Sequence, residues 1–214
     1  VLYEDEHLLA LNKPPLLATS LDRADPERPS LMKLLHADLV RGAGWAKERG
    51  LTYLANAHRL DYEVSGVFLL AKSRPALVAL ANLFGSHKPM LTFVALVHGA
   101  PHEREFEVDA KIRAQPGRPG IMRVDPKHGK TSRTLFHERE AFRGHTLLEC
   151  VPLTERPHQV RLHLRCARLS LVADRVYGGP PLWLSDLKKR FLLKEGHQEK
   201  PLLERVALHA ERLC

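Results

Sequence analysis

The pattern of apolar residues along the chain restricts its fold more than any other feature. Segments with strand-like alternation and segments with helical spacing follow one another irregularly, without the regular strand–helix–strand repeat of a parallel α/β protein. The pattern therefore predicts an α+β protein with a mixed, largely antiparallel sheet flanked by helices. The 214 residues can bury one sizeable core without disulfides or metal ions, and no linker is long enough to separate domains. We therefore expect a single domain over 1–214.

Six short apolar segments bounded by turn residues are expected to form strands. They are Val1–Tyr3, Leu8–Asn12, Gly66–Lys72, Thr92–Val97, Thr146–Leu153 and Val206–Leu213. The segment 41–50 is polar, which predicts a loop. The segment 109–130 is rich in proline, glycine and basic residues, which predicts a long hairpin or a partly mobile loop.

Four segments have the spacing or the capping residues of helices. Ser30 is a suitable N-cap for a helix with leucines on one side, and Gly42 is its expected end. A second helix is expected to begin at Ser73-Arg74-Pro75 and to continue to Phe84. Two further helices are expected over 156–168 and 184–194. The helix at 156–168 should place Val160, His163 and Leu164 on one face and Arg161, Arg165 and Arg168 on the other.

The charge balance and the cysteines indicate the type of partner and the compartment. The formal net charge is +8 with a pI near 9.6, which favours a polyanionic partner, although the same excess would also serve solubility. The three cysteines, Cys150, Cys166 and Cys214, are odd in number and widely spaced, which predicts buried thiols in a reducing, cytoplasmic compartment. No apolar run has the length of a membrane span, and the N-terminus does not resemble a signal peptide. Because the chain begins at Val1, we expect part of the natural protein to be missing.

The stretch "AHRLDYEVSG" places a carboxylate, Asp61, directly before an apolar segment that is expected to be a buried strand. Arg59 precedes this aspartate by two residues. From this stretch alone, Asp61 could be part of a structural ion pair in a turn, a metal ligand, or a nucleophile beside a cation. The structural alternative is as good as the others, because aspartate often satisfies backbone donors in turns.

Several common kinds of site are not supported by the sequence. Of the thirteen histidines, His158 and His163 lie five residues apart, without a carboxylate or cysteine at ligand spacing, so we expect no metal site. His163 is expected to be a packed helix residue, and His58 is expected to orient the turn before Asp61. The chain has no Gly-x-Ser-x-Gly nucleophile elbow and no glycine-rich phosphate loop.

Asp61 also belongs to a longer pattern. "HRLD" at 58–61 is followed by Ser65-Gly66 and by an apolar segment that ends in Ala71-Lys72. This pattern resembles the signature of the RluA branch of the RNA pseudouridine synthases. Four other stretches resemble motifs of the same family in the same order, so the resemblance covers nearly the whole chain. They are "LNKPPLLATS", "PHQVRLHL", "VADRVYGG" and "ALHAERL".

The resemblance implies a fold and an activity. It implies a catalytic domain with a central basic cleft that detaches uracil from ribose C1′, rotates the base and rejoins it through C5. The residues expected to carry the chemistry are Asp61 and Arg161. An aspartate is ionised at neutral pH, with a reference pKa near ~3.9, and a nearby guanidinium favours the charged form. Whether Asp61 attacks C1′ or removes a C2′ proton is left open. The resemblance implies no metal and no organic cofactor.

Four further residues are expected to contact the substrate: Phe93, Arg59, Leu162 and His58. Phe93 stands where the family usually has tyrosine, so it is expected to stack on a flipped uracil without donating a proton. The alternative is a core aromatic on an alternating strand, and the spacing from Asp61 favours the site. Arg59 could enter the space that the flipped base vacates, or pair with Glu63 or a phosphate; contact with RNA is favoured. Leu162 resembles a residue of the uracil pocket, and as a plain helix leucine it would look the same.

Other motif residues have two explanations of equal weight. Lys13, Lys72 and Tyr177 match family motifs, yet each could be a solvated or packing residue. Seven basic residues could bind phosphates, although such runs are usually solvated surface. They are Lys111, Arg113, Arg118, Arg123, Lys127, Lys130 and Arg133.

We therefore expect a monomeric enzyme that modifies a stem-loop of transfer or ribosomal RNA and has no membrane partner. Two alternatives belong to other classes. A non-catalytic RNA-binding or RNA-remodelling protein on the same scaffold is mildly favoured by Phe93 and by Ala173, which stands where the family usually has glycine. A metal-dependent hydrolase would require a metal site, which the histidine spacing does not support.

Overall fold

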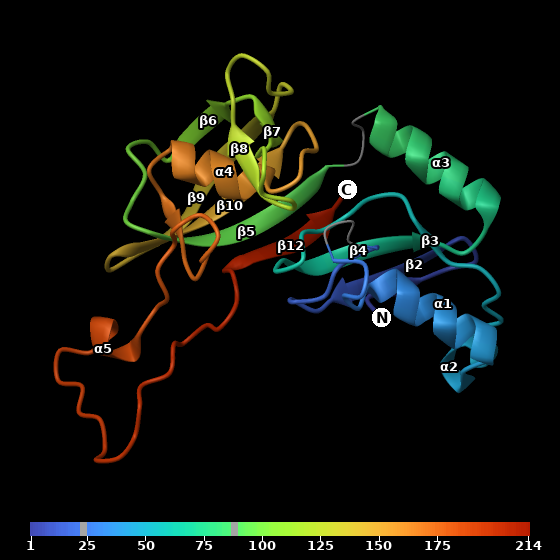
Figure 1. Ribbon diagram of the computed structural model, residues 1–214, viewed down its shortest axis with the longest axis horizontal. Coiled ribbons are helices and arrows are strands. Elements are labelled where there is room, and N and C mark those ends of the chain that lie inside the picture. The colour runs from blue at the N-terminus through green and yellow to red at the C-terminus, as the bar shows by residue number, and fades with distance from the viewer. Residues whose placement is uncertain (22–24, 87–89) are drawn as a thin grey trace. The chain divides into compact units, whose positions relative to one another are not determined.

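A computed structural model describes residues 1–21, 25–86 and 90–214. The chain divides into two compact units, which Figure 1 shows in the colours of the sequence. Unit 1 contains Val1–Leu91 and Ala210–Cys214, and unit 2 contains Thr92–His209. Both units combine helices with antiparallel strands, so the predicted α+β class is confirmed. The single-domain boundary and the central basic cleft stay predictions.

Unit 1 is built on a small antiparallel sheet. Its strands are β1 (Tyr3–Glu4), β2 (Leu8–Lys13), β3 (Ala55–Asn56), β4 (Ser65–Ala71) and the end of β12 (Leu208–Leu213). Strand β2 pairs with β1 on one side and with β4 on the other, and β3 also pairs with β4. Leu9, Phe68 and Leu70 are buried and form the centre of this unit's core.

A glycine explains part of the pattern that follows Asp61. Gly66 has φ +123°, and a Cβ added to it would collide with the backbone of Ala210 in β12. A side chain at this position would therefore separate the two backbones. The close approach of these segments therefore requires the glycine of the signature.

Three helices belong to unit 1, and two of them confirm the sequence prediction. They are α1 (Leu31–Arg41), α2 (Gly44–Glu48) and α3 (Arg74–Gly85). Ser30 caps α1 by accepting a hydrogen bond from the Lys33 N–H, and Gly42 ends it in the left-handed conformation. Ser73 caps α3 in the same way. The loop predicted over 41–50 is wrong, because Trp45 packs back and donates to Asp38 at 2.6 Å, which supports the short helix α2.

Unit 2 contains a larger antiparallel sheet. Its strands are β5 (Leu91–His98, from Thr92 onward), β6 (Glu105–Asp109), β9 (Arg133–Phe142), β10 (His145–Pro152) and β11 (Ser170–Leu171). Strand β10 lies between β5 and β9, β6 pairs with the far edge of β9, and β11 pairs with β5. Ala95, Val97 and Leu148 are fully buried in this sheet. All six strands expected from the sequence are present, with shifted ends.

The segment 109–130 contains a hairpin, as predicted. Strands β7 (Ile112–Ala114) and β8 (Met122–Val124) form it. The neighbouring strands β6 and β9 were not expected, because charged residues alternate along both of them. In each of these strands most of the charged side chains point to water, and only the opposite face carries less exposed residues such as the buried Phe136.

The helices of unit 2 are shorter than expected. Helix α4 spans Gln159–Cys166 and lies against β9 and β10 (Figure 1), whereas α5 spans only Leu184–Leu187. The predicted helix over 184–194 is therefore wrong beyond its first turn. Residues 188–190 are three consecutive exposed cations, and Leu192 is 92% exposed, so the segment buries no apolar face that would stabilise a helix.

The prediction of buried thiols is correct for one cysteine. Cys150 is buried in β10, whereas Cys166 and Cys214 are exposed, so the apolar neighbours of these two residues gave a wrong prediction. Among the described residues, no helix is long and apolar enough to span a membrane.

Candidate active site

Asp61 lies in a tight turn of unit 1, between β3 and β4. The Val64 N–H donates to the Asp61 carbonyl at 3.2 Å, which closes the turn. The Asp61 side chain is half-buried. The turn leads directly into the buried strand β4, as the sequence predicted, so the aspartate has a fixed backbone next to a rigid element.

The loop after β2 holds the Asp61 turn on both sides. The Leu17 N–H donates to the Tyr62 carbonyl at 3.1 Å. The Thr19 hydroxyl donates to the Leu60 carbonyl at 2.8 Å and accepts from the Leu60 N–H at 3.1 Å. These contacts join segments about forty residues apart in the sequence, so the short spacings that define the motif could not reveal them.

His58 contacts β4 and α3, and its role in orienting the turn before Asp61 stays a prediction. Its Nε2 accepts a hydrogen bond from the Leu69 N–H at 2.9 Å, and its ring stacks on Phe84 at 5.0 Å. The ring is only 3% exposed, and burial lowers its pKa to about 4, so it is neutral. A direct contact between His58 and substrate stays a prediction, and the burial of the ring favours the orienting role.

A buried cation lies near Asp61. Lys13, at the end of β2, is completely buried, and its Nζ donates to the carbonyls of Pro14 at 2.9 Å and Leu17 at 2.7 Å. Burial lowers its pKa to about 8, while attraction to Asp61 and Glu63 acts in the opposite direction. Lys13 is therefore close enough to Asp61 for a charge interaction. The alternative of a solvated lysine is wrong.

The other lysine and the arginine of this region have different surroundings. Lys72 donates to the Glu4 carboxylate at 3.0 Å and to the Asp5 carbonyl at 2.7 Å, which fastens the end of β4 to the first turn of the chain. Arg59 is exposed, which is compatible with the predicted contact with RNA.

Arg161 is the buried cation of unit 2. Its guanidinium donates twice to the Asp174 carboxylate, at 2.8 and 2.7 Å, and both side chains are at most 1% exposed. The sequence groups Arg161 with Arg165 and Arg168 on one helix face, but Arg161 is buried, whereas the other two arginines are exposed. Asp174 belongs to the motif "VADRVYGG", and the sequence does not indicate its pairing with Arg161, since that pairing depends on the fold.

Helix α4, which carries Arg161, is fastened to β9 by buried polar side chains. Gln159 donates to the Arg133 carbonyl at 2.9 Å and to the Thr134 hydroxyl at 3.0 Å. His163 lies 2.8 Å from the same hydroxyl through Nδ1 and 3.3 Å from the Ala110 carbonyl through Nε2. A carbonyl only accepts, so Nε2 carries the proton, and burial lowers the pKa of the ring. His163 is a packed helix residue, as predicted.

Tyr177 connects Arg161 with the β7–β8 hairpin. Its ring lies 5.1 Å from the guanidinium, and its hydroxyl contacts His158 Nδ1 at 2.6 Å. The same hydroxyl accepts from the Met122 N–H of β8 at 3.1 Å. Tyr177 is therefore a packing residue with defined hydrogen bonds, which agrees with one of its two predicted explanations.

The two apolar residues expected in the uracil pocket are both buried. Phe93 is 8% exposed and lies opposite Cys150 in the β5–β10 pair, on the same strand face as the buried Ala95 and Val97. Leu162, on α4 next to Arg161, is 4% exposed. These positions fit a core role as well as a pocket wall, so substrate contact stays a prediction for both.

The seven basic residues proposed for phosphate binding are not equivalent. Arg123 and Arg113 pair with Asp125 at 2.9 and 3.5 Å, and backbone N–H groups and Arg123 hold the Asp125 pKa at about 2. Arg133 forms a two-bond pair with Glu107 at 2.7 and 2.9 Å. The other four are exposed cations: Lys111, Arg118, Lys127 and Lys130.

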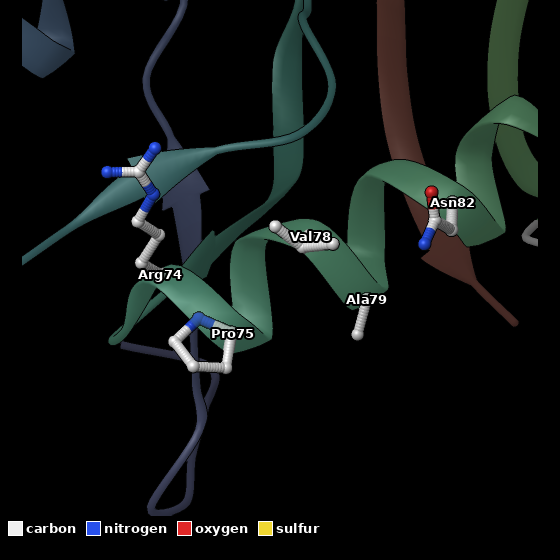
Figure 2. A pocket seen from close by; sticks show the side chains of 5 residues that line it. All are labelled: Arg74, Pro75, Val78, Ala79 and Asn82. Atoms are coloured by element: carbon white, nitrogen blue, oxygen red, sulfur yellow. The ribbon is translucent and has the colours of Figure 1, made fainter.

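Two surface hollows of unit 1 contain none of the predicted site residues. One lies on the outer face of α3 and is lined by Arg74, Pro75, Val78, Ala79 and Asn82 (Figure 2). Its lining has one cation but no nucleophile or carboxylate. The other is lined mainly by apolar residues of the sheet and α3. Within the described ranges, no three histidine, cysteine or carboxylate side chains are grouped as for a metal ion.

Comparison with known proteins identifies the family. The family model described as RNA pseudouridylate synthase matches residues 7–165, which is most of the chain. The chain belongs to this family. The matched residues of the synthase model include Asp61, Phe93 and Arg161 and end before Asp174 and Tyr177.

Relatives within the synthase family confirm the RluA-type resemblance. The chain is 36% identical over 184 residues to ribosomal large subunit pseudouridine synthase D of Xylella fastidiosa, covering 84% of this chain and 51% of that protein. It is 32% identical to ribosomal large subunit pseudouridine synthase C of Escherichia coli, covering 83% and 53%. The chain thus spans about half the length of these curated relatives.

A solved synthase-family structure has the same fold. Human RNA pseudouridylate synthase domain containing 4 matches with a TM-score of 0.71 at 20% identity, covering 100% of this chain and 82% of that one. At this identity the likeness concerns the fold alone.

Proposed function

We propose that this chain converts uridine to pseudouridine in structured RNA and that Asp61 is the catalytic carboxylate. Membership of the synthase family supports the reaction class. The observation that carries the assignment of Asp61 is its place in a turn whose flanking peptide groups are held by Leu17 and Thr19. Catalytic groups require such fixed geometry, since small displacements of a reacting atom lower the rate strongly.

The reaction requires one carboxylate and no net redox change. The N1–C1′ bond of uridine breaks, the base rotates, and a C5–C1′ bond forms; the C5 proton leaves and N1 takes up a proton. Asp61 acts either as the nucleophile at C1′ or as the base at C2′, and both routes need its ionised form. Lys13 attracts this carboxylate within unit 1, and we assign Arg161 as the second cation of the reaction.

The substrate contacts are assigned to residues with suitable chemistry. Phe93 and Leu162 would form an apolar wall for the flipped base, and the exposed Arg59 would contact the RNA. Four exposed cations near the β7–β8 hairpin would bind phosphates. They are Lys111, Arg118, Lys127 and Lys130. We favour ribosomal over transfer RNA, because the curated relatives carry ribosomal large subunit names.

The test compares the parent with Asp61→Asn on transcripts of large-subunit ribosomal RNA and of transfer RNA from the host. Pseudouridine is mapped by chemical labelling, and RNA affinity is measured by filter binding. We expect Asp61→Asn to remove detectable isomerisation and to leave affinity within a few fold, because phosphate contacts dominate binding. Asp186→Asn is the control, since Asp186 is an exposed carboxylate of α5.

Two results would contradict the proposal. Appreciable turnover by Asp61→Asn would show that another group performs the chemistry. If the parent binds RNA tightly but forms no pseudouridine in either transcript, the chain is a non-catalytic RNA-binding protein on this scaffold.

A further inference from the structure

Thr19 makes an unusual pair of hydrogen bonds. Its hydroxyl donates to the Leu60 carbonyl at 2.8 Å and accepts from the Leu60 N–H at 3.1 Å, so one side chain satisfies both backbone groups of one residue. The Thr19 side chain is 2% exposed and Leu60 is 6% exposed. Neither Leu60 group can therefore exchange the hydroxyl for bulk water without local opening.

The position of these bonds matters because Leu60 directly precedes Asp61. The Leu60 carbonyl belongs to the planar peptide group that includes the nitrogen and Cα of Asp61. Fixing this carbonyl therefore fixes the orientation of the peptide plane that precedes the Asp61 side chain. On the other side of Asp61, the Tyr62 carbonyl accepts from the Leu17 N–H at 3.1 Å. We name this arrangement of Leu17 and Thr19 around the Asp61 turn the clasp.

The clasp is itself anchored to a helix. The Thr19 carbonyl accepts from the Met32 N–H at 3.1 Å, and the Ala18 carbonyl accepts from the Leu31 N–H at 2.8 Å. Both donors belong to the first turn of α1, where backbone N–H groups have no partner within the helix. The start of α1 therefore holds the loop, and the loop holds the Asp61 turn.

We propose that Thr19 is a positioning residue for the isomerisation: its hydroxyl fixes the peptide that carries Asp61. This inference rests on the proposed function, because it assigns the fixed orientation of Asp61 a catalytic consequence. Among the clasp contacts, the hydroxyl is the one that a substitution can remove, since the Leu17 bond is made by the backbone.

The test uses three variants of the full chain. Thr19→Val has nearly the same shape but no hydroxyl, Thr19→Ser keeps the hydroxyl, and Thr146→Val is the matched control. Thr146 is also fully buried, and its hydroxyl donates to the Gly99 carbonyl at 2.8 Å, but it lies in β10 of unit 2 and has no role in the proposed chemistry. If Thr19→Val does not fold, Thr19→Ala replaces it, since it leaves room for a water molecule.

The first measurement is the single-turnover rate on a transcript of large-subunit ribosomal RNA, with filter-binding affinity alongside. We expect Thr19→Val to lower the rate constant by at least tenfold while RNA affinity stays within twofold. Thr19→Ser should recover the rate to within about threefold of the parent, and Thr146→Val should keep it. If the rate of Thr19→Val falls no further than that of Thr146→Val, the positioning role is overturned.

The second measurement does not depend on activity. Amide hydrogen exchange of the peptide that covers 60–64 should accelerate in Thr19→Val and not in Thr146→Val. Unchanged exchange would overturn the proposal even if the rate fell. If the parent forms no pseudouridine but this exchange accelerates, the proposed function fails while the fixing of the turn by Thr19 stands.

Discussion

At the scale of single residues, the sequence motif identifies Asp61, but the residues that fix its turn are recognised only in the structure. Asp61 stands out in the sequence because it follows "HRL" and precedes an apolar strand, and the structure places it in the turn that this order predicts. Thr19, which holds the turn, and Lys13, which attracts the Asp61 carboxylate, belong to a stretch about forty residues earlier. Their polar contacts are with backbone carbonyls and a distant carboxylate, which no local spacing reveals.

Lys13 gives a prediction for the pH dependence of stability. Its pKa is about 8 in the folded protein, against a reference value near ~10.4 when unfolded. Between these values the unfolded chain binds more protons, so the contribution of Lys13 to the free energy of unfolding should rise with pH, by up to about 3 kcal/mol. Urea unfolding of the parent and of Lys13→Met, from pH 7.5 to 10, should show the parent gaining stability relative to the variant.

The difference between the two proteins cancels the titration of all other groups, so it reports Lys13 alone. A constant difference over this pH range would mean that the Lys13 amine is solvated in the folded protein. If the parent instead loses stability relative to Lys13→Met as the pH rises, the pKa of Lys13 is raised in the folded protein. The carboxylate neighbours of Lys13 would then outweigh its burial.

At the scale of elements, α4 is held by its buried ion pair. Arg161 donates two hydrogen bonds to Asp174, and removing one member of a buried pair leaves an uncompensated charge. Asp174→Asn should therefore lower the free energy of unfolding by about 3–5 kcal/mol, measured with urea at pH 7. Glu107→Gln is the matched control, because Glu107 also pairs with an arginine through two bonds but at the surface, where we expect a loss of about 1 kcal/mol or less. Equal losses in the two variants would contradict the buried pairing.

Elements with strong local signals were predicted well. Ser30 and Gly42 bound α1, Ser73 begins α3, and the apolar run after Asp61 is β4, because caps and buried strands depend on neighbouring residues. The errors follow from tertiary contacts. Helix α2 is stabilised by the hydrogen bond from Trp45 to Asp38, and the helix predicted beyond 187 is absent because most residues of that segment are exposed.

For the candidate site, too, the sequence identified residues in local motifs and missed those whose partners are distant in the sequence. Asp61 and Arg161 could be selected from the sequence because each belongs to a short motif, and both lie within the matched part of the family model, as does Phe93. Asp174 and Thr19 were not assigned a role, since their importance comes from partners that the fold brings together. The sequence did not indicate the burial of Arg161, because helical spacing cannot show that a charged side chain is buried against a carboxylate.

At the scale of the whole molecule, the excess of eight positive charges indicates how RNA affinity should depend on salt. The hairpin region carries four exposed cations, while Arg113, Arg123 and Arg133 already have carboxylate partners. A cation that is already paired releases fewer counterions when it meets a phosphate. Four effective contacts therefore predict a slope of about −3 to −4 for the logarithm of the RNA association constant against the logarithm of the salt concentration.

The slope is measured by filter binding of a ribosomal RNA transcript over a series of KCl concentrations. Replacing Lys111, Arg118, Lys127 and Lys130 together by alanine should bring the slope close to zero if these residues supply the phosphate contacts. Replacing the three paired arginines by alanine is the control and should change the slope less, because their carboxylate partners compete with RNA. A parent slope shallower than about −1 would exclude a phosphate-dominated contact. A steep slope that the fourfold variant keeps would instead assign the RNA contact to other cations, of which Lys188, Lys189 and Arg190 are exposed next to one another.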